Sequence, residues 1–375
     1  MATATNTGTG RRPVPLPALQ RAWWQPRLTP LTALLAPLGW LVGAVAARRR
    51  AKVESGREAP APLPVPVIVV GNLIVGGAGK TPTVIALVAL LRAWGRTPGI
   101  VSRGHGSADA QARLLDANTP AADPADFGDE PVLMHRRTGA PVAVARARRE
   151  AAAALLAAHP EVDVIVADDG LQHHALPRDV ELVVFDGRGI GNGRVLPAGP
   201  LRERPRDLWP APATRAAARL VLVNGRWPAP PALPSPAPAE RCWNAERALG
   251  GAVALPAWTR GEPARLEALA ALRGRPLLAA AGIGDPERFF TMLESAGLTI
   301  TRLPLPDHAV FEPLPWDAAV PEVVVTEKDA VKLAGRAPPG QRIWVVTLDF
   351  GLPAGLAAAL RAALENARPL RAPRP

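Results

Sequence analysis

One segment near the start of the chain restricts the fold more than any other. Residues 65–70 (VPVIVV) form a mostly β-branched run, which is typical of a strand buried in a parallel sheet. The run leads into a glycine-rich stretch at residues 71–83 (GNLIVGGAGKTPT), and residues 83–94 (TVIALVALLRAW) carry apolar side chains at helical spacing. A strand, a glycine loop and a helix in this order predict the opening unit of a nucleotide-binding α/β domain.

The glycine loop has the residues needed to hold nucleotide phosphates. Glycines let backbone N–H groups wrap a phosphate at a helix N-terminus, Lys80 can reach the β- and γ-phosphates, and the Thr81 hydroxyl can bind Mg²⁺. Ile74 stands where the longer GxxxxGKT pattern has its first glycine, so the loop resembles the shorter GGxGKT variant. We expect ATP and Mg²⁺ as cofactors, bound by Gly76, Gly77, Ala78, Gly79, Lys80, Thr81 and Pro82.

The scarcity of lysine adds weight to Lys80. The sequence has lysine only at positions 52, 80, 328 and 332, among 44 basic residues. A compact ammonium group suits a phosphate pocket as a point charge, so we expect Lys80 to act in catalysis as well as in binding. The alternative is a glycine turn that only precedes a helix.

A second motif lies at residues 162–174 (VDVIVADDGLQHH), where an apolar strand pattern ends in two acids. The carboxyl edge of a parallel sheet is where ligands of such folds bind. Asp168 and Asp169 are therefore candidate Mg²⁺ ligands, directly or through water, unless they cap a helix. His173 and His174 could be ligands or polar loop residues.

Repeated alternation of strand and helix patterns predicts a doubly wound sheet. A Pro- and Ala-rich stretch at residues 227–240 interrupts this alternation, and a second α/β series follows it. We expect an extension at residues 1–53, a P-loop NTPase-like parallel-sheet domain at residues 54–226, and a second, smaller α/β domain at residues 227–375 that closes a cleft. Cys242, the single cysteine, excludes an intramolecular disulfide and indicates a cytosolic body.

The positive charge is concentrated in the extension. The net charge is +11, but residues 1–53 contain eight basic side chains and no acid. Because the remaining chain is nearly neutral and carries no nucleic-acid-binding motif, we expect no nucleic acid partner.

An apolar run in the extension predicts contact with a membrane. Residues 31–47 carry no charge and are followed by three arginines, at positions 48–50. We expect a retained helix, spanning or interfacial, with Trp23, Trp24 and Trp40 near the headgroups and the arginines facing anionic lipid. A signal peptide and a soluble core helix are the alternatives.

With these motifs placed, the chain resembles the tetraacyldisaccharide 4'-kinase family, the lipid A 4'-kinases of Gram-negative bacteria. The resemblance covers most of the chain after about residue 20. Besides the two motifs above, it is carried by residues 101–106 (VSRGHG), 128–131 (GDEP), 191–203 (GNGRVLPAGPLRE), 281–290 (AGIGDPERFF), 305–311 (LPDHAVF) and 324–333 (VVTEKDAVKL). His105 departs from the pattern, which has an aromatic residue at that position.

This resemblance implies a P-loop kinase that transfers the γ-phosphate of ATP to the 4'-hydroxyl of a tetraacylated glucosamine disaccharide 1-phosphate, giving lipid IVA. The N-terminal helix would sit on the inner membrane, at its cytoplasmic face, and we expect the chain to be a monomer. Asp129 and His308 would together activate the hydroxyl, whereas the alternative roles are a helix cap and a loop residue. Asp168, Asp169 and Glu203 would belong to the Mg²⁺ and phosphate environment.

Other assignments from the residues stay open. Arg103 could reach a substrate phosphate or pair with an acid, and Lys328 and Lys332 could face the cleft or solvent. Asp285 is expected to cap a helix. A membrane-associated switch ATPase is the main rival function, although such proteins usually carry lysine where this chain has Val75. A soluble small-molecule kinase is a second rival.

Overall fold

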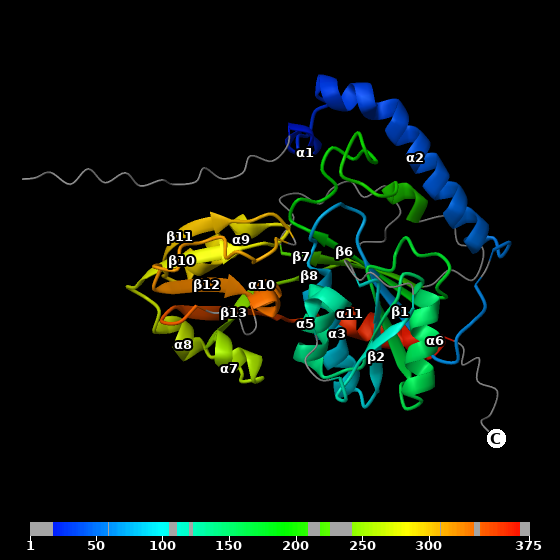
Figure 1. The fold of residues 1–375 in the computed structure, drawn as a ribbon. Coiled ribbons are helices and arrows are strands. Elements are labelled where there is room, and N and C mark those ends of the chain that lie inside the picture. The colour runs from blue at the N-terminus through cyan, green and yellow to red at the C-terminus, as the bar shows by residue number, and fades with distance from the viewer. Residues whose placement is uncertain are drawn as a thin grey trace, which may run out of the picture.

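The computed structural model describes residues 18–58, 60–104, 111–119, 123–208, 218–225, 242–307, 309–333 and 338–367 of the chain. These residues form two α/β domains, each built on its own sheet, and an N-terminal pair of helices that lies over the first domain (Figure 1). The predicted fold class, a P-loop-type parallel sheet with a second, smaller α/β domain, is confirmed.

Within the described residues, the first sheet has eight strands in the order β3-β4-β2-β5-β1-β6-β7-β8. Neighbouring strands are parallel except β3, which runs antiparallel to β4. The central strands are buried along their whole length, as the apolar runs predict. The strands are β1 (Val67–Gly71), β2 (Pro98–Ser102), β3 (Arg113–Leu115), β4 (Val142–Val144), β5 (Val164–Asp168), β6 (Val180–Asp186), β7 (Ala218–Asn224) and β8 (Cys242–Ala245).

Helices cover both faces of this sheet and build separate cores. Successive residues of β1 point to opposite faces, so Ile68 packs in the core formed with α3, α5 and α11, and Val69 packs in the core formed with α6. The helices are α3 (Lys80–Ala93), α4 (Pro124–Phe127), α5 (Asp129–Thr138), α6 (Arg148–Ala158) and α11 (Ala354–Asn366), with a 3₁₀ turn at η1 (Pro205–Leu208).

The second domain is built on a five-stranded sheet in the order β11-β10-β12-β13-β9 within the described residues. Its strands are parallel except β9, which runs antiparallel to β13. The elements are β9 (Arg247–Ala254), α7 (Leu255–Thr259), α8 (Leu266–Ala270), β10 (Pro276–Ala281), α9 (Pro286–Ser295), β11 (Thr299–Pro304), β12 (Glu322–Thr326), α10 (Glu327–Leu333) and β13 (Arg342–Phe350).

The chain crosses between the domains at different places from those predicted. β8 lies beyond the expected boundary at residue 227, yet it pairs with β7 in the first sheet. The C-terminal helix α11 also returns to the first domain and packs on β6, β7 and β8. The elements before and after the second domain, β8 and α11, therefore both belong to the first domain. The second domain is inserted between them.

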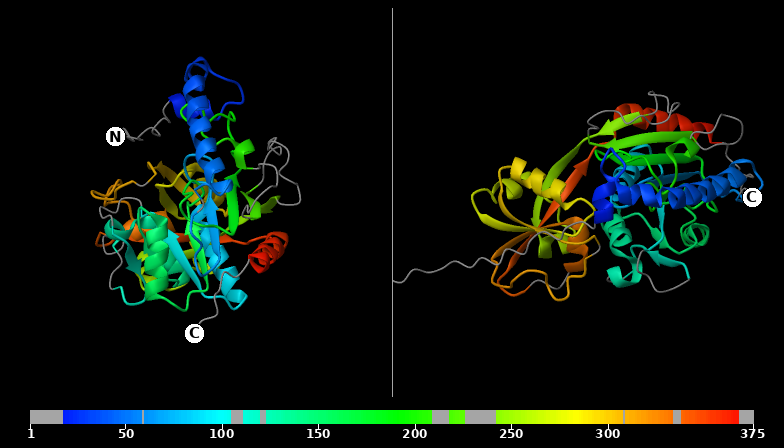
Figure 2. Two further views of the ribbon diagram at one scale, coloured as in Figure 1. Left: turned by 90° about the vertical axis from the view of Figure 1, so that its right-hand side faces the viewer. Right: turned by 90° about the horizontal axis from the view of Figure 1, so that it is seen from above.

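The N-terminal helices are α1 (Ala18–Trp23) and α2 (Pro30–Glu54). α2 runs along the outside of the first domain, as the view from above shows (Figure 2). Thr29 caps it in a capping box with Thr32. Gly39 permits its close packing, since a Cβ there would lie 2.7 Å from the Val195 carbonyl oxygen.

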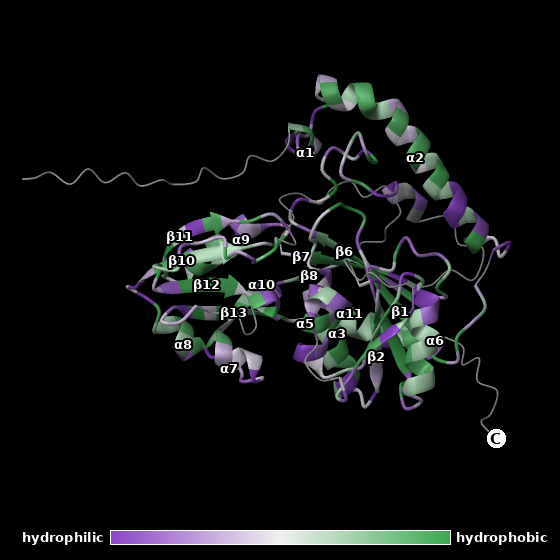
Figure 3. Cartoon of the chain, viewed as in Figure 1, coloured by the Kyte–Doolittle hydropathy of each residue, from purple (hydrophilic) through white to green (hydrophobic). Residues whose placement is uncertain are grey.

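The outward face of α2 is apolar along most of the helix (Figure 3). Leu34 is 78% exposed and Trp40 is 67% exposed. Among the described residues, α2 alone is long and apolar enough to cross a membrane, judged by length and composition. Two details differ from expectation: Arg50 is buried, and Trp24 lies under the Arg188 guanidinium rather than on the exposed face.

Candidate functional site

The glycine loop between β1 and α3 is held by side chains that donate to its carbonyl groups. Asn72 Nδ2 donates to the Gly76 oxygen (3.2 Å), Arg188 Nη2 to the Gly77 oxygen (2.8 Å) and Asn224 Nδ2 to the Ala78 oxygen (2.5 Å). These side chains hold the carbonyl groups of the loop in place. The backbone N–H groups of the same loop can then bind an anion at the start of α3.

A larger residue at position 79 would be strained in this arrangement. Its φ is +84°, and a Cβ would lie 1.8 Å from Arg247 Nη2 and 2.3 Å from Asn224 Nδ2. The second domain also contacts this loop, because a Cβ on Gly284 would lie 2.5 Å from the Gly77 nitrogen. The loop is therefore enclosed by groups from both domains.

Lys80, the first residue of α3, points toward the acids after β5. Its Nζ lies 3.3 Å from Asn72 Oδ1 and 3.6 Å from Asp169 Oδ1. Thr81 and Pro82 follow in the first turn of α3. The structure thus brings the predicted phosphate lysine next to one of the two predicted magnesium acids.

Asp168 ends β5 and is 2% exposed. Ser102 Oγ donates to its Oδ2 over 3.2 Å, whereas its Oδ1 is buried without a hydrogen-bond partner among the described residues. Burial, together with the charges of Glu130 and Asp169, raises the pKa of Asp168 to about 7. A buried acceptor with no donor suits a bound cation.

Asp169 occupies a conformation rare for residues other than glycine, with φ +45°. Burial acts to raise its pKa, but the charges of Lys80 and Arg202 hold that pKa below the usual value. Arg202 Nη1 donates to Asp169 Oδ1 over 2.9 Å. Arg148 fixes the turn, since its guanidinium donates to the carbonyl oxygens of both acids.

The donor set fits Mg²⁺ bound together with phosphate. Among the described residues, no cluster of three or more His, Cys, Asp or Glu could hold a metal unaided. Magnesium sites of phosphoryl-transfer enzymes commonly use one or two carboxylates plus phosphate oxygens and water. The orphaned Oδ1 of Asp168 beside the lysine of the loop matches such a site.

These groups line one open cleft of about 1080 Å³. Arg103 lines it, and both roles considered for this residue, contact with a phosphate and pairing with an acid, stay predictions. Residues to which the sequence analysis gave no individual role also line it, namely Ser102, Glu130, Arg146, Arg148, Gln172 and Arg202. The position of Arg148 just after β4, at the carboxyl edge of the sheet, is the signal that could have identified it.

Asp129 lies at the start of α5 and faces this cleft. Its Oδ2 is 3.9 Å from Lys332 Nζ on α10, and its Oδ1 accepts from the Glu130 nitrogen over 3.0 Å. His308, its predicted partner, lies outside the described residues, as does His105. Asp307, the residue before His308, lines the same cleft, and the pairing of Asp129 with His308 stays a prediction.

Lys328 and Lys332 join α10 to the first domain and do not face solvent. Lys328 Nζ lies 3.0 Å from both Glu130 Oε1 and Asp307 Oδ1. Burial acts to lower the Lys328 pKa, but the charges of Glu130 and Asp307 raise it above the usual value. The α5–α10 contact therefore closes one side of the cleft with paired charges.

The remaining predicted residues have mainly structural contacts. Glu203 is buried and accepts from Arg50 Nε over 3.0 Å, and its role toward magnesium stays a prediction. Burial and nearby arginines lower the pKa of His173 to about 4 and of His174 to about 3, so both rings are neutral near pH 7. Asp285 caps α9 as predicted.

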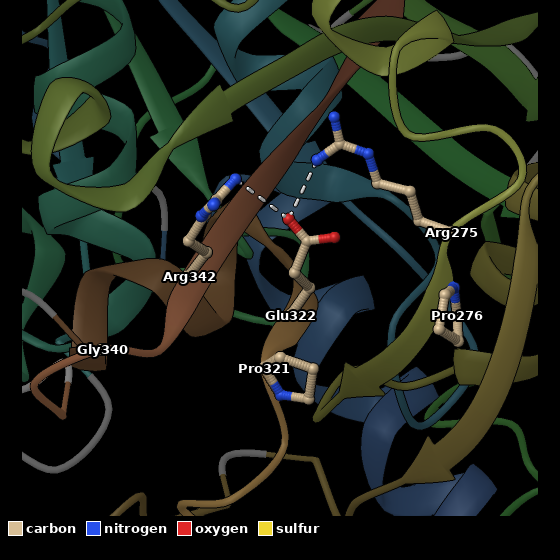
Figure 4. A pocket seen from close by; sticks show the side chains of 6 residues that line it. All are labelled: Arg275, Pro276, Pro321, Glu322, Gly340 and Arg342. Carbon is tan, nitrogen blue, oxygen red and sulfur yellow. Dashed lines mark hydrogen bonds and ion pairs between the residues drawn. The ribbon is translucent and has the colours of Figure 1, made fainter.

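A second pocket, of about 460 Å³, lies at the amino-terminal ends of β10, β12 and β13 (Figure 4). Arg275 and Arg342 both contact Glu322 there, at 3.0 and 3.6 Å. Gly284 and Asp307 follow the opposite, carboxyl ends of β10 and β11, where the second sheet meets the P-loop domain. Because the charged side chains of this pocket already pair with one another, we take the cleft as the candidate active site.

Comparison with known proteins gives a consistent assignment. A profile of the Tetraacyldisaccharide-1-P 4'-kinase family matches residues 31–365. The tetraacyldisaccharide 4'-kinase of Methylibium petroleiphilum is 52% identical, with 96% of this chain and 97% of that protein covered. The tetraacyldisaccharide 4'-kinase of Leptothrix cholodnii is 49% identical, with 94% of this chain and 97% of that protein covered.

A solved structure has the same fold. It is the crystal structure of the "apo" form of LpxK from Aquifex aeolicus in complex with ATP, with a TM-score of 0.70 at 23% identity over 89% of this chain and 99% of that one. The resemblance predicted from the motifs is confirmed, and the chain belongs to the tetraacyldisaccharide 4'-kinase family.

Proposed function

We propose that this chain transfers the γ-phosphate of ATP to the 4'-hydroxyl of a tetraacylated glucosamine disaccharide 1-phosphate, giving lipid IVA. The observation that carries the proposal is the convergence, in one cleft, of the phosphate loop, the Asp168–Asp169 pair and Asp129, in a chain of this kinase family. The complex of LpxK from Aquifex aeolicus with ATP supports ATP as the phosphate donor.

Within this proposal, the loop N–H groups and Lys80 bind the phosphates of ATP and stabilise the charge that develops during transfer. Asp168, Asp169, Thr81 and Glu203 are the proposed Mg²⁺ environment, and the metal when bound would neutralise charge on the phosphate oxygens. Arg103 and Arg148, which line the cleft, add positive charge to it.

Asp129 and His308 are proposed to activate the sugar hydroxyl, which is a poor nucleophile near neutral pH. A positioned base typically contributes about 10² to 10⁴ in rate. The ammonium of Lys332 lies 3.9 Å from Asp129 Oδ2 and can help to orient this carboxylate. An ionised Asp129 can accept a proton or orient the imidazole of His308.

We further propose that α2 places the enzyme on the cytoplasmic face of the inner membrane, and that the chain acts as a monomer. The exposed apolar side chains of α2 support the membrane contact. A mass from sedimentation in detergent tests the monomeric state.

The deciding experiment incubates purified protein with γ-labelled ATP, Mg²⁺ and extracted lipid A precursors. We expect label in a glycolipid, in amounts that depend on both metal and lipid. ATP hydrolysis that lipid does not affect would instead favour a switch ATPase, and label in a water-soluble product would favour a small-molecule kinase.

A further inference from the structure

The last turns of α2 end in a buried ion-pair cluster that membrane contact does not explain. Arg48 and Arg49 are exposed, whereas Arg50 is 2% exposed. Arg50 Nε donates to Glu203 Oε2 over 3.0 Å, and its Nη1 lies 3.5 Å from Glu181 Oε1. Buried pairs of this kind contribute little stability compared with apolar residues of similar volume. We therefore infer that the ion pairs of Arg50 serve to orient the groups around them.

The first connection from Arg50 to the nucleotide site runs through Glu203. The next residue in the chain, Arg202, donates from Nη1 to Asp169 Oδ1 over 2.9 Å and to Gln172 Oε1 over 3.3 Å. Asp169 in turn lies 3.6 Å from Lys80 Nζ. One peptide unit therefore separates the partner of Arg50 from the arginine that holds Asp169.

The second connection runs through Glu181 and reaches the same loop. Arg178 Nη1 donates to Glu181 Oε1 over 2.9 Å. The same guanidinium also donates to the carbonyl oxygens of Leu171 and His173, at 2.9 and 2.5 Å. These carbonyls flank Gln172, so both connections end on the loop that follows β5.

Residues 191–204, which we call the linking segment, lie between α2 and the phosphate loop. A Cβ on Gly43 would lie 3.3 Å from Arg204 Cγ, which shows how closely α2 packs on the linking segment. On its other side the segment pairs with the residues before the phosphate loop, through Val75 N to Pro200 O (2.9 Å) and Arg202 N to Leu73 O (2.6 Å). α2, the linking segment and the phosphate loop thus form one continuous packed unit.

We propose that Arg50 is a positioning residue of the kinase, which sets Arg202 and Asp169 for nucleotide binding through Glu203 and Glu181. Arg50 does not itself line the cleft; it acts by fixing the linking segment and the loop after β5. The inference rests on the proposed ATP binding. It also means that the helix expected at the lipid surface and the nucleotide site are held in one fixed relation.

Calorimetric titration of the full-length protein in detergent with Mg²⁺ and a non-hydrolysable ATP analogue tests this inference. Partners that orient the groups around a metal site typically contribute about 10- to 100-fold in affinity, so we expect Arg50→Met to weaken binding by roughly tenfold. Arg49→Met, the same change on an exposed neighbour, is the matched control and should bind like the wild type. Arg50→Lys keeps the charge but not the donor fork, and should fall between the two.

A double-mutant cycle with Arg202→Met separates positioning from general stability. If Arg50 acts through Arg202, the double mutant should bind about as weakly as Arg202→Met alone. Folded Arg50→Met protein with wild-type affinity, or losses that multiply in the double mutant, would overturn the inference. Should Arg50→Met not fold, Arg50→Lys decides, because wild-type affinity in that folded variant overturns it equally. Failure of the wild type to bind the analogue would refute the proposed function instead.

Discussion

Replacing Asp168 with asparagine should stabilise the metal-free fold while abolishing phosphoryl transfer. Burial and neighbouring acids raise the pKa of Asp168 from 3.8 to about 7. A shift of about 3 units corresponds to at most about 4 kcal/mol of unfavourable free energy for the ionised form, at about 1.36 kcal/mol per unit. The asparagine amide keeps an acceptor for Ser102 but leaves an NH₂ group to be satisfied, at about 1–3 kcal/mol. We therefore expect a net gain of roughly 1–3 kcal/mol above pH 7.

The sign of the pH dependence follows from the raised pKa. The folded protein binds this proton more tightly than the unfolded chain, so the wild type loses stability as pH rises from about 4 to about 7. Below that pH range Asp168 is protonated in both the folded and the unfolded state. Above it, the folded protein carries the full unfavourable free energy of the buried, ionised carboxylate. The stability advantage of Asp168→Asn should therefore grow across this range and stay constant at higher pH.

Urea unfolding in EDTA at several pH values between about 4 and 8 measures this difference. Asp349→Asn, the same change at an exposed position of β13, is the control and should alter stability by less than about 0.5 kcal/mol. A variant no more stable than the wild type at pH 8, or an advantage independent of pH, would refute the reasoning. Transfer activity in a folded Asp168→Asn protein would also contradict the proposed metal role.

Three further outcomes are expected. Lys80→Ala should fold normally and lower kcat by roughly 10² or more, because it removes a preorganised charge on the transferring phosphate; a near-normal rate with γ-labelled ATP would remove the phosphate-loop assignment. Deleting residues 1–46, which retains Arg50, should raise the KM for lipid far more than the KM for ATP, and equal losses would indicate a folding defect. Asp129→Ala, His308→Ala and the double mutant should lose similar amounts of kcat, whereas losses that multiply would argue against joint action.

The parts of the site that adjoin a strand could be predicted from the sequence. β1 leads through the glycine loop to Lys80, and β5 ends at Asp168 with Asp169 next in the chain, so the topology of a parallel sheet brings these residues to one edge. Such positions can be recognised in the sequence because the buried apolar run and the polar residue after it are neighbours in the chain.

The groups that come from distant segments were not predictable in this way. Arg148 reaches the carbonyl oxygens of Asp168 and Asp169 from the start of α6, and Asn224 reaches the phosphate loop from the end of β7. The ends of β4 and β7 place Arg148 and Asn224 at the ligand-binding edge of the sheet, but the partners that they contact depend on strand order, which no local pattern gives. The return of β8 and α11 to the first sheet escaped prediction for the same reason, because a short strand and an Ala-rich helix fit either domain.

Arg48, Arg49 and Arg50 lie near the end of α2, and their charge and their helical spacing lead to different predictions of which of them face lipid. Counted as charge, all three were expected to face anionic lipid. The buried residues of α2 are Thr32, Gly39, Gly43 and Arg50, which are spaced by seven, four and seven positions and so share one face of the helix. Periodicity thus assigns Arg50 to the protein side and leaves Arg48 and Arg49 for a lipid surface, where each basic residue contributes about 1 kcal/mol. Because Arg50 is held by Glu203 and Glu181, α2 cannot rotate about its axis without breaking buried ion pairs. In the proposed membrane placement, the exposed side chains of Leu34 and Trp40 would therefore face the bilayer in an orientation about the helix axis that the catalytic domain sets.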